Sequence, residues 1–135
     1  MELSLNLGQF RRLLDLAYIG NWVLNSARGE DRIAEFDEAV SLLFSKCREL
    51  GMDSLAERFG GMSIPSKAFA EGGIHEAIMD YEDTIFFEIL AEELARRDII
   101  NEGGAEDDSE QINERMVDYI AEFERNGTDN IVLNL

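Results

Sequence analysis

The segment from residue 10 to residue 24, FRRLLDLAYIGNWVL, constrains the fold most, because as a helix it would be apolar on nearly every side. At helical spacing one apolar face contains Phe10, Leu13, Leu14, Ala17 and Leu24. Ile19, Trp22 and Val23 lie largely on the other side, and one neighbouring surface cannot cover both faces. Either other helices pack around the second half of this helix, or Tyr18, Ile19 and Trp22 contact a second chain.

The same periodicity predicts several further helices. Asn6 with Gln9 and Asp108 with Gln111 have the spacing of capping boxes, which mark helix starts. We expect helices from about 7 to 27, 31 to 50, 53 to 59 and 74 to 100, and from 109 to the Asn126-Gly127 stop. The fourth of these is either continuous or broken near Asp83, a residue that could cap a new helix.

The two ends of the chain carry short strand patterns. Residues 2 to 7, ELSLNL, and residues 130 to 135, NIVLNL, alternate apolar and polar positions. We expect them to pair, within one chain or between two, because a lone strand leaves backbone groups unsatisfied; the alternative is a frayed tail. The expected fold is therefore mainly α, a compact single-domain bundle of four to five helices over residues 1 to 135, with short terminal strands.

Negative charge is concentrated in the second half of the chain. The whole chain has a net charge of -17, of which residues 1 to 67 contribute -2 and residues 68 to 135 contribute -15. No basic residue occurs between Lys67 and Arg96. Because contacts to a nucleic-acid backbone need clustered Lys and Arg, we expect no direct binding to nucleic acid.

The sequence contains no secretory signal and no apolar run long enough for a membrane span. We therefore expect a cytoplasmic protein with no membrane contact. Cys47 is the only cysteine, and it lies on the apolar face of the helix predicted from 31 to 50, which predicts a buried hydrophobic role.

Several kinds of ligand-binding and metal site are not supported by the residues present. The segment from 61 to 68, GMSIPSKA, has Ser66 and Ala68 where a phosphate-binding loop needs Gly and a hydroxyl. The acidic loop after Asp98 lacks the bidentate Glu of an EF-hand, and His75, expected to be an exposed polar residue, is the only histidine for zinc or di-iron sites. We assign no catalytic residue, no metal site and no cofactor.

Three hypotheses for function follow. The first is a noncatalytic, inhibitor-type interaction protein that binds a basic protein partner through Glu106, Asp107, Asp108 and Glu110. The second is an enzyme or ligand-binding domain in which carboxylates hold a divalent metal ion. The third is a self-associating structural protein, a homodimer with Tyr18, Ile19 and Trp22 or the terminal strands at its interface.

Overall fold

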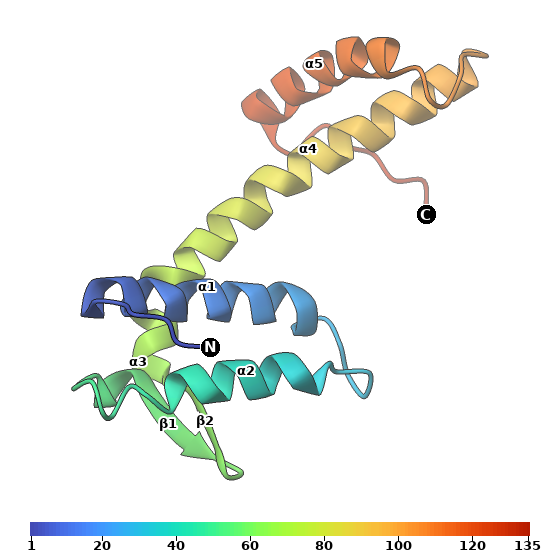
Figure 1. Ribbon diagram of the computed structural model, residues 1–135. Coiled ribbons are helices and arrows are strands. Elements are labelled where there is room, and N and C mark those ends of the chain that lie inside the picture. Colours follow the sequence, from blue (N-terminus) through green and yellow to red (C-terminus); the bar gives the residue numbers. More distant parts are fainter. The chain divides into compact units, whose positions relative to one another are not determined.

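A computed structural model describes all 135 residues and confirms a mainly α fold with four helices and a two-stranded antiparallel sheet (Figure 1). The elements are α1 (Leu7–Asn25), α2 (Ala34–Phe44), a 3₁₀ turn (Asp53–Leu55), β1 (Ala56–Phe59), β2 (Met62–Pro65), the single turn α3 (Lys67–Phe69), a π-type turn (Ala70–Ile74), α4 (His75–Asn101) and α5 (Ser109–Asn126).

Contacts within the chain divide it into two compact units, Met1–Ile78 (unit 1) and Met79–Leu135 (unit 2). The boundary between them falls inside α4. The sequence-based expectation of a single domain over residues 1 to 135 is not tested by this division and stays a prediction.

In unit 1, α2 runs back alongside α1, and the two form a helical hairpin (Figure 1). The capping box at Asn6 and Gln9 is present in both directions and starts α1 as expected. Phe10 and Leu14 of α1 pack with Val40 and Phe44 of α2 in the core. Leu24 is exposed, so the apolar face predicted for α1 is not buried at its C-terminal end.

The predicted helix from 31 to 50 is shorter in the structure. It ends at Phe44, and the chain continues in tight turns in which Lys46 N–H donates to Leu43 O and Cys47 N–H to Phe44 O. Cys47 is completely buried in the same core, as the sequence predicts, because the turns still direct it inward.

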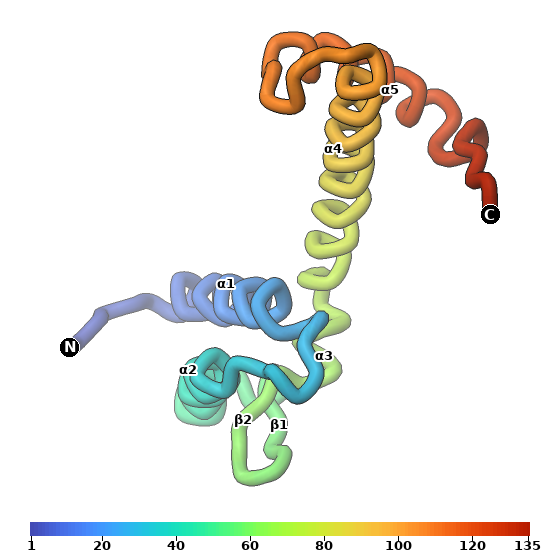
Figure 2. The backbone as a smooth tube through the Cα atoms, turned by 90° about the vertical axis from the view of Figure 1, so that its right-hand side faces the viewer, coloured from blue at the N-terminus to red at the C-terminus, as the bar shows by residue number.

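Both strands lie near the middle of the sequence and not at its ends. β1 and β2 form a hairpin in which Phe59 pairs with Met62 across a Gly60-Gly61 turn, and both glycines have positive φ (56° and 80°). The hairpin packs beside α2, where Ser63 N–H donates to Ser41 Oγ at 3.0 Å (Figure 2).

Two sequence-based expectations are therefore corrected. Residues 53 to 59 do not form a helix, because their second half is strand β1. The terminal segments contain no strand, since neither finds a neighbouring strand to satisfy its backbone, and Leu3, Val132, Leu133 and Leu135 are exposed.

In unit 2, α5 folds back alongside the C-terminal part of α4 (Figures 1 and 2). Ala95 and Ile99 of α4 pack with Ile112 of α5, and Phe87 packs on Phe123 with ring centroids 5.4 Å apart. The helix α4 is continuous through Asp83, which excludes the alternative of a break there. The Asp108 cap of α5 is present as predicted.

None of the helices has an apolar stretch long enough to cross a lipid bilayer.

Candidate functional site

A groove of about 630 Å³ lies in unit 1 between α1, α2 and the β1–β2 hairpin. Its lining is mostly apolar and includes Tyr18, Trp22, Val40, Phe59, Met62 and Ile64. Polar side chains from Asn21, Arg32 and Asp37 occupy one edge. A groove of this size and composition is typical of sites that bind an apolar side chain or a small ligand.

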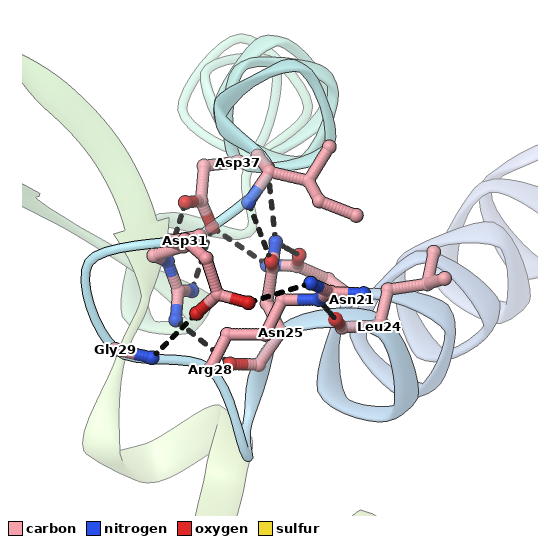
Figure 3. A network of polar contacts seen from close by, with 9 residues as sticks. Asn21, Leu24, Asn25, Arg28, Gly29, Asp31 and Asp37 are labelled. Carbon is pink, nitrogen blue, oxygen red and sulfur yellow. Dashed lines mark hydrogen bonds and ion pairs between the residues drawn. The ribbon is translucent and has the colours of Figure 1, made fainter.

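The polar edge is a closed network around Asp37 (Figure 3). The Asp37 carboxylate accepts hydrogen bonds from Arg32 Nη2 at 2.7 Å and from Asn21 Nδ2 at 2.9 Å. The hydrogen bond from Arg32, with a smaller contribution from Asn21, holds the pKa of Asp37 below its usual value. Through these hydrogen bonds the Asp37 carboxylate holds the side chains of Arg32 and Asn21 in place, and so orders the polar edge of the groove.

His75 lies against the aromatic side chains of α1, and the expectation that it is an exposed polar residue is wrong. Its Nε2 is 2.7 Å from the Tyr18 hydroxyl, and its ring meets Trp22 edge to face at 4.8 Å. The positive φ of Gly73 (102°) turns the chain into α4 just before His75 and places the ring there. Burial raises the pKa of Tyr18, so the phenol is a neutral hydrogen-bonding group at neutral pH.

The three residues proposed for self-association differ in whether they line the groove. Tyr18 packs on Phe69 with ring centroids 5.3 Å apart, and both Tyr18 and Trp22 line the groove. Ile19 is half-buried and does not line it. The contacts within unit 1 do not test self-association through these three residues, which stays a prediction.

The four acidic residues proposed for partner binding lie in the turn before α5 and in its first turn. Asp108 has a structural task, because its carboxylate accepts from Gln111 N–H at 3.2 Å and from Gln111 Nε2 at 2.6 Å. Glu106 is bound to the fold through its backbone oxygen, which accepts from Arg96 at 2.6 Å. The carboxylates of Glu106, Asp107 and Glu110 have no protein partner.

The charge of unit 2 extends well beyond that segment. Its sequence holds 17 acidic and four basic residues, a net charge of -13, against -4 for unit 1. Three of the four arginines are already paired within the unit: Arg96 with Glu92, Arg97 with Asp98, and Arg115 with Asp98 and Glu102. The remaining 14 acidic side chains form no ion pair, so the unit carries a large excess of exposed negative charge.

Asp98 is the most contacted carboxylate of unit 2. It accepts hydrogen bonds from the Tyr119 hydroxyl at 2.5 Å and from Arg97 at 2.7 Å. The Tyr119 hydrogen bond first, and Arg97 after it, lower the pKa of Asp98. Its partners link α4 to α5, which indicates a structural function for this carboxylate.

Residues suited to metal binding or nucleophilic chemistry do not gather at one point. No three side chains among His, Cys, Asp and Glu come together as metal ligands. Burial raises the pKa of the Cys47 thiol, which keeps it protonated in the core.

The sequence did not identify the groove of unit 1, because the hairpin that forms one wall was not predicted. The Gly60-Gly61 pair was the available signal, since two adjacent glycines favour the turn of a tight hairpin. Nothing in the local sequence around Asp37 distinguishes it from the other acidic residues of α2.

Comparison of the chain with protein-family models, with curated proteins and with solved structures found no match.

Proposed function

We propose that the protein is a noncatalytic binding protein whose unit 2 recognises a basic protein partner. The observation that supports this proposal most is the charge of unit 2, where 14 of 17 acidic side chains have no ion-pair partner in the fold. Uncompensated charge of one sign speeds the association of an oppositely charged partner and sets its orientation. A cytoplasmic location is part of the proposal.

The partner class that fits best is a protein whose basic surface binds nucleic acid. Carboxylates on the surface of unit 2 would occupy positions that otherwise bind phosphates, and the protein would then act as an inhibitor. Glu106, Asp107 and Glu110 are the part of this surface nearest the start of α5. Asp108 contributes its charge there while it caps the helix.

The first experiment is a pull-down with tagged full-length protein from an extract of its natural host at low salt. Proteins released along a salt gradient are identified by mass spectrometry, and a purified candidate is titrated against the protein at several salt concentrations. We expect a basic partner whose affinity falls steeply with salt. Binding that does not change with salt would contradict the proposal.

A matched pair of variants locates the contact. Asp107→Ser with Glu110→Ser removes two unpaired carboxylates and leaves the Asp108 cap intact. Glu30→Ser with Glu57→Ser removes the same charge from exposed, unpaired positions of unit 1. We expect the first pair to weaken binding severalfold and the second to have little effect; equal weakening by both pairs would exclude the start of α5 as the contact surface.

A further inference from the structure

Helix α4 has an exposed apolar stripe that α5 does not cover. Met79, Phe86, Ile89 and Ile100 are 60%, 51%, 55% and 46% exposed. Successive members are 7, 3 and 11 residues apart, spacings that place all four on one side of a helix. We call these four residues the outer stripe of α4.

The outer stripe lies on the side of α4 opposite the contact with α5. Ala91, Ala95 and Ile99 are buried on the α5 side. Phe86 and Phe87 point about 100° apart, as adjacent helical residues do, and their rings meet edge to face at 5.1 Å. Phe87 packs on Phe123 of α5, while Phe86 is half exposed. The helix therefore has a second apolar face beyond the one that unit 2 needs for its own core.

The unpaired charges on this face are negative. Glu82 and Glu93 lie three and seven residues after members of the outer stripe, so they share its side of the helix. Neither forms an ion pair. Two arginines, Arg96 and Arg97, also lie on this side near the end of the helix, and both are already paired, with Glu92 and Asp98.

The exposed apolar side chains and the unpaired carboxylates together determine which kind of partner surface can cover the outer stripe. A second copy of the chain would bring one unit 2, with a net charge of -13, against another, and like charges at a close interface oppose association. A helix with one apolar face flanked by Lys or Arg would bury the apolar side chains and pair the carboxylates. From Met79 to Ile100 the stripe is about 32 Å long, which matches a partner helix of roughly six turns.

We propose that the outer stripe of α4 is the docking site for a basic amphipathic helix of a partner protein. This inference rests on the proposed function and deepens it, because it names the element of the partner that is recognised and the face that recognises it. The mode of recognition is that of a helix which places its apolar face on a complementary apolar surface, with charges fixing its orientation.

The test uses a defined probe in place of the unidentified partner. A fluorescein-labelled synthetic peptide of about 21 residues, with Leu at i, i+3, i+4 and i+7 and Lys elsewhere, is titrated against the full chain by anisotropy at near-physiological salt. A second peptide has the same composition in an order that spreads Leu around the helix. We expect the patterned peptide to bind about tenfold more tightly than the reordered one, because only the first can bury a continuous apolar face.

Variants of the protein identify the face. Phe86→Ser with Ile89→Ser removes the centre of the outer stripe, and because both side chains are exposed the helix content by circular dichroism is expected to be unchanged. Val117→Ser removes an equally exposed apolar side chain from α5, away from the stripe. We expect the first variant to weaken the patterned peptide about tenfold and the control to change it less than about twofold.

Two results would overturn the inference. Equal binding of both peptides, or equal weakening by the double variant and Val117→Ser, would show that only charge attracts the probe. A dimer mass by light scattering that falls in the double variant would identify a second copy as the occupant. In either case, salt-sensitive binding of a basic partner that Asp107→Ser with Glu110→Ser weakens would leave the proposed function intact, so the two failures can be told apart.

Discussion

Asn25 closes the connection between α1 and α2 through two hydrogen bonds to one residue, Ile33. The Asn25 Oδ1 atom accepts from Ile33 N–H at 2.8 Å, and Asn25 Nδ2 donates to Ile33 O at 3.0 Å (Figure 3). Asn25 is completely buried, and its amide also donates to Asn21 Oδ1 at 2.8 Å. Ile33 immediately precedes α2, so this one side chain fixes where the second helix of unit 1 begins.

Replacement of Asn25 by Ala is expected to destabilise unit 1 by about 1–3 kcal/mol, because it leaves the partly buried N–H of Ile33 without its partner, while Ile33 O keeps only the hydrogen bond from Phe36 N–H at 3.3 Å. Urea unfolding monitored by the fluorescence of Trp22, the single tryptophan, measures the effect. The control is Ser26→Ala, an exposed neighbour whose hydroxyl forms no hydrogen bond, with an expected change within about 0.5 kcal/mol. Similar values for the two variants would show that the network does not hold the loop.

The features that the sequence predicted correctly depend on local chemistry. The capping box at Asn6 and the Asp108 N-cap mark the starts of α1 and α5, because a cap is formed by residues three positions apart. The β1–β2 hairpin depends instead on packing beside α2, through contacts such as Ser63 with Ser41, 22 positions apart in sequence. The prediction of strands in the terminal segments was wrong, because an alternating pattern forms a strand only beside another strand. Neither terminal segment has such a neighbour.

The candidate site was predictable in part. The acidic composition of unit 2 is visible in the sequence, but the cap formed by Asp108 and the backbone contact of Glu106 separate these residues from the free carboxylates beside them. The apolar pattern predicts that Phe86 and Phe87 cannot face one neighbour, but only the position of α5 decides which of the two stays exposed. Asn25 lies 11 residues after Leu14 on the same helical face, and this polar residue on an apolar face was the signal for the network.

Gly104 follows α4 at a point where a side chain has no room. A Cβ atom at this position would lie 2.6 Å from Cγ2 of the buried Ile99 and 3.1 Å from its backbone oxygen. Gly104→Ala is therefore expected to destabilise unit 2 by about 1–3 kcal/mol, measured as thermal unfolding by circular dichroism. Gly20→Ala is the matched control with the opposite sign: it lies within α1 with no atom within 4 Å, and we expect it to stabilise by about 0.5–1 kcal/mol. The steric argument fails if Gly104→Ala is neutral.

The lowered pKa of Asp37 predicts a loss of stability in acid. Its ionised form is favoured in the folded protein by hydrogen bonds from Arg32 and Asn21. That contribution is fully present above the unfolded pKa of about 3.9 and is lost as pH falls through the lower folded pKa. Asp37→Asn should be less stable than the native chain at pH 7, and the difference should shrink below about pH 4. Urea unfolding across this range, with the exposed Glu38→Gln as control, measures the difference; a gap that is constant with pH would contradict the assignment.

The raised pKa of Tyr119 predicts a loss of stability at high pH. Burial first, and the hydrogen bond to Asp98 second, raise its pKa above the usual value of about 10. A raised pKa means that the protonated phenol stabilises the folded state fully below about pH 10, and that this contribution is lost as pH rises through the folded value. Tyr119→Phe should lower the stability of unit 2 by about 1 kcal/mol at pH 7, because Asp98 loses one donor and keeps Arg97. The difference from the native chain should shrink above about pH 10.

Thermal unfolding by circular dichroism at pH 7 and at about pH 11 measures both parts of the Tyr119 prediction. Tyr81→Phe is the matched control, since Tyr81 is an exposed tyrosine of the same unit and its hydroxyl has no partner. Its removal should change stability by less than about 0.5 kcal/mol at either pH. If Tyr119→Phe and Tyr81→Phe have the same effect at pH 7, the hydrogen bond between α5 and Asp98 does not stabilise the pair of helices. If the two differ at pH 7 and the difference persists unchanged at high pH, the phenol stabilises through packing and not through its proton.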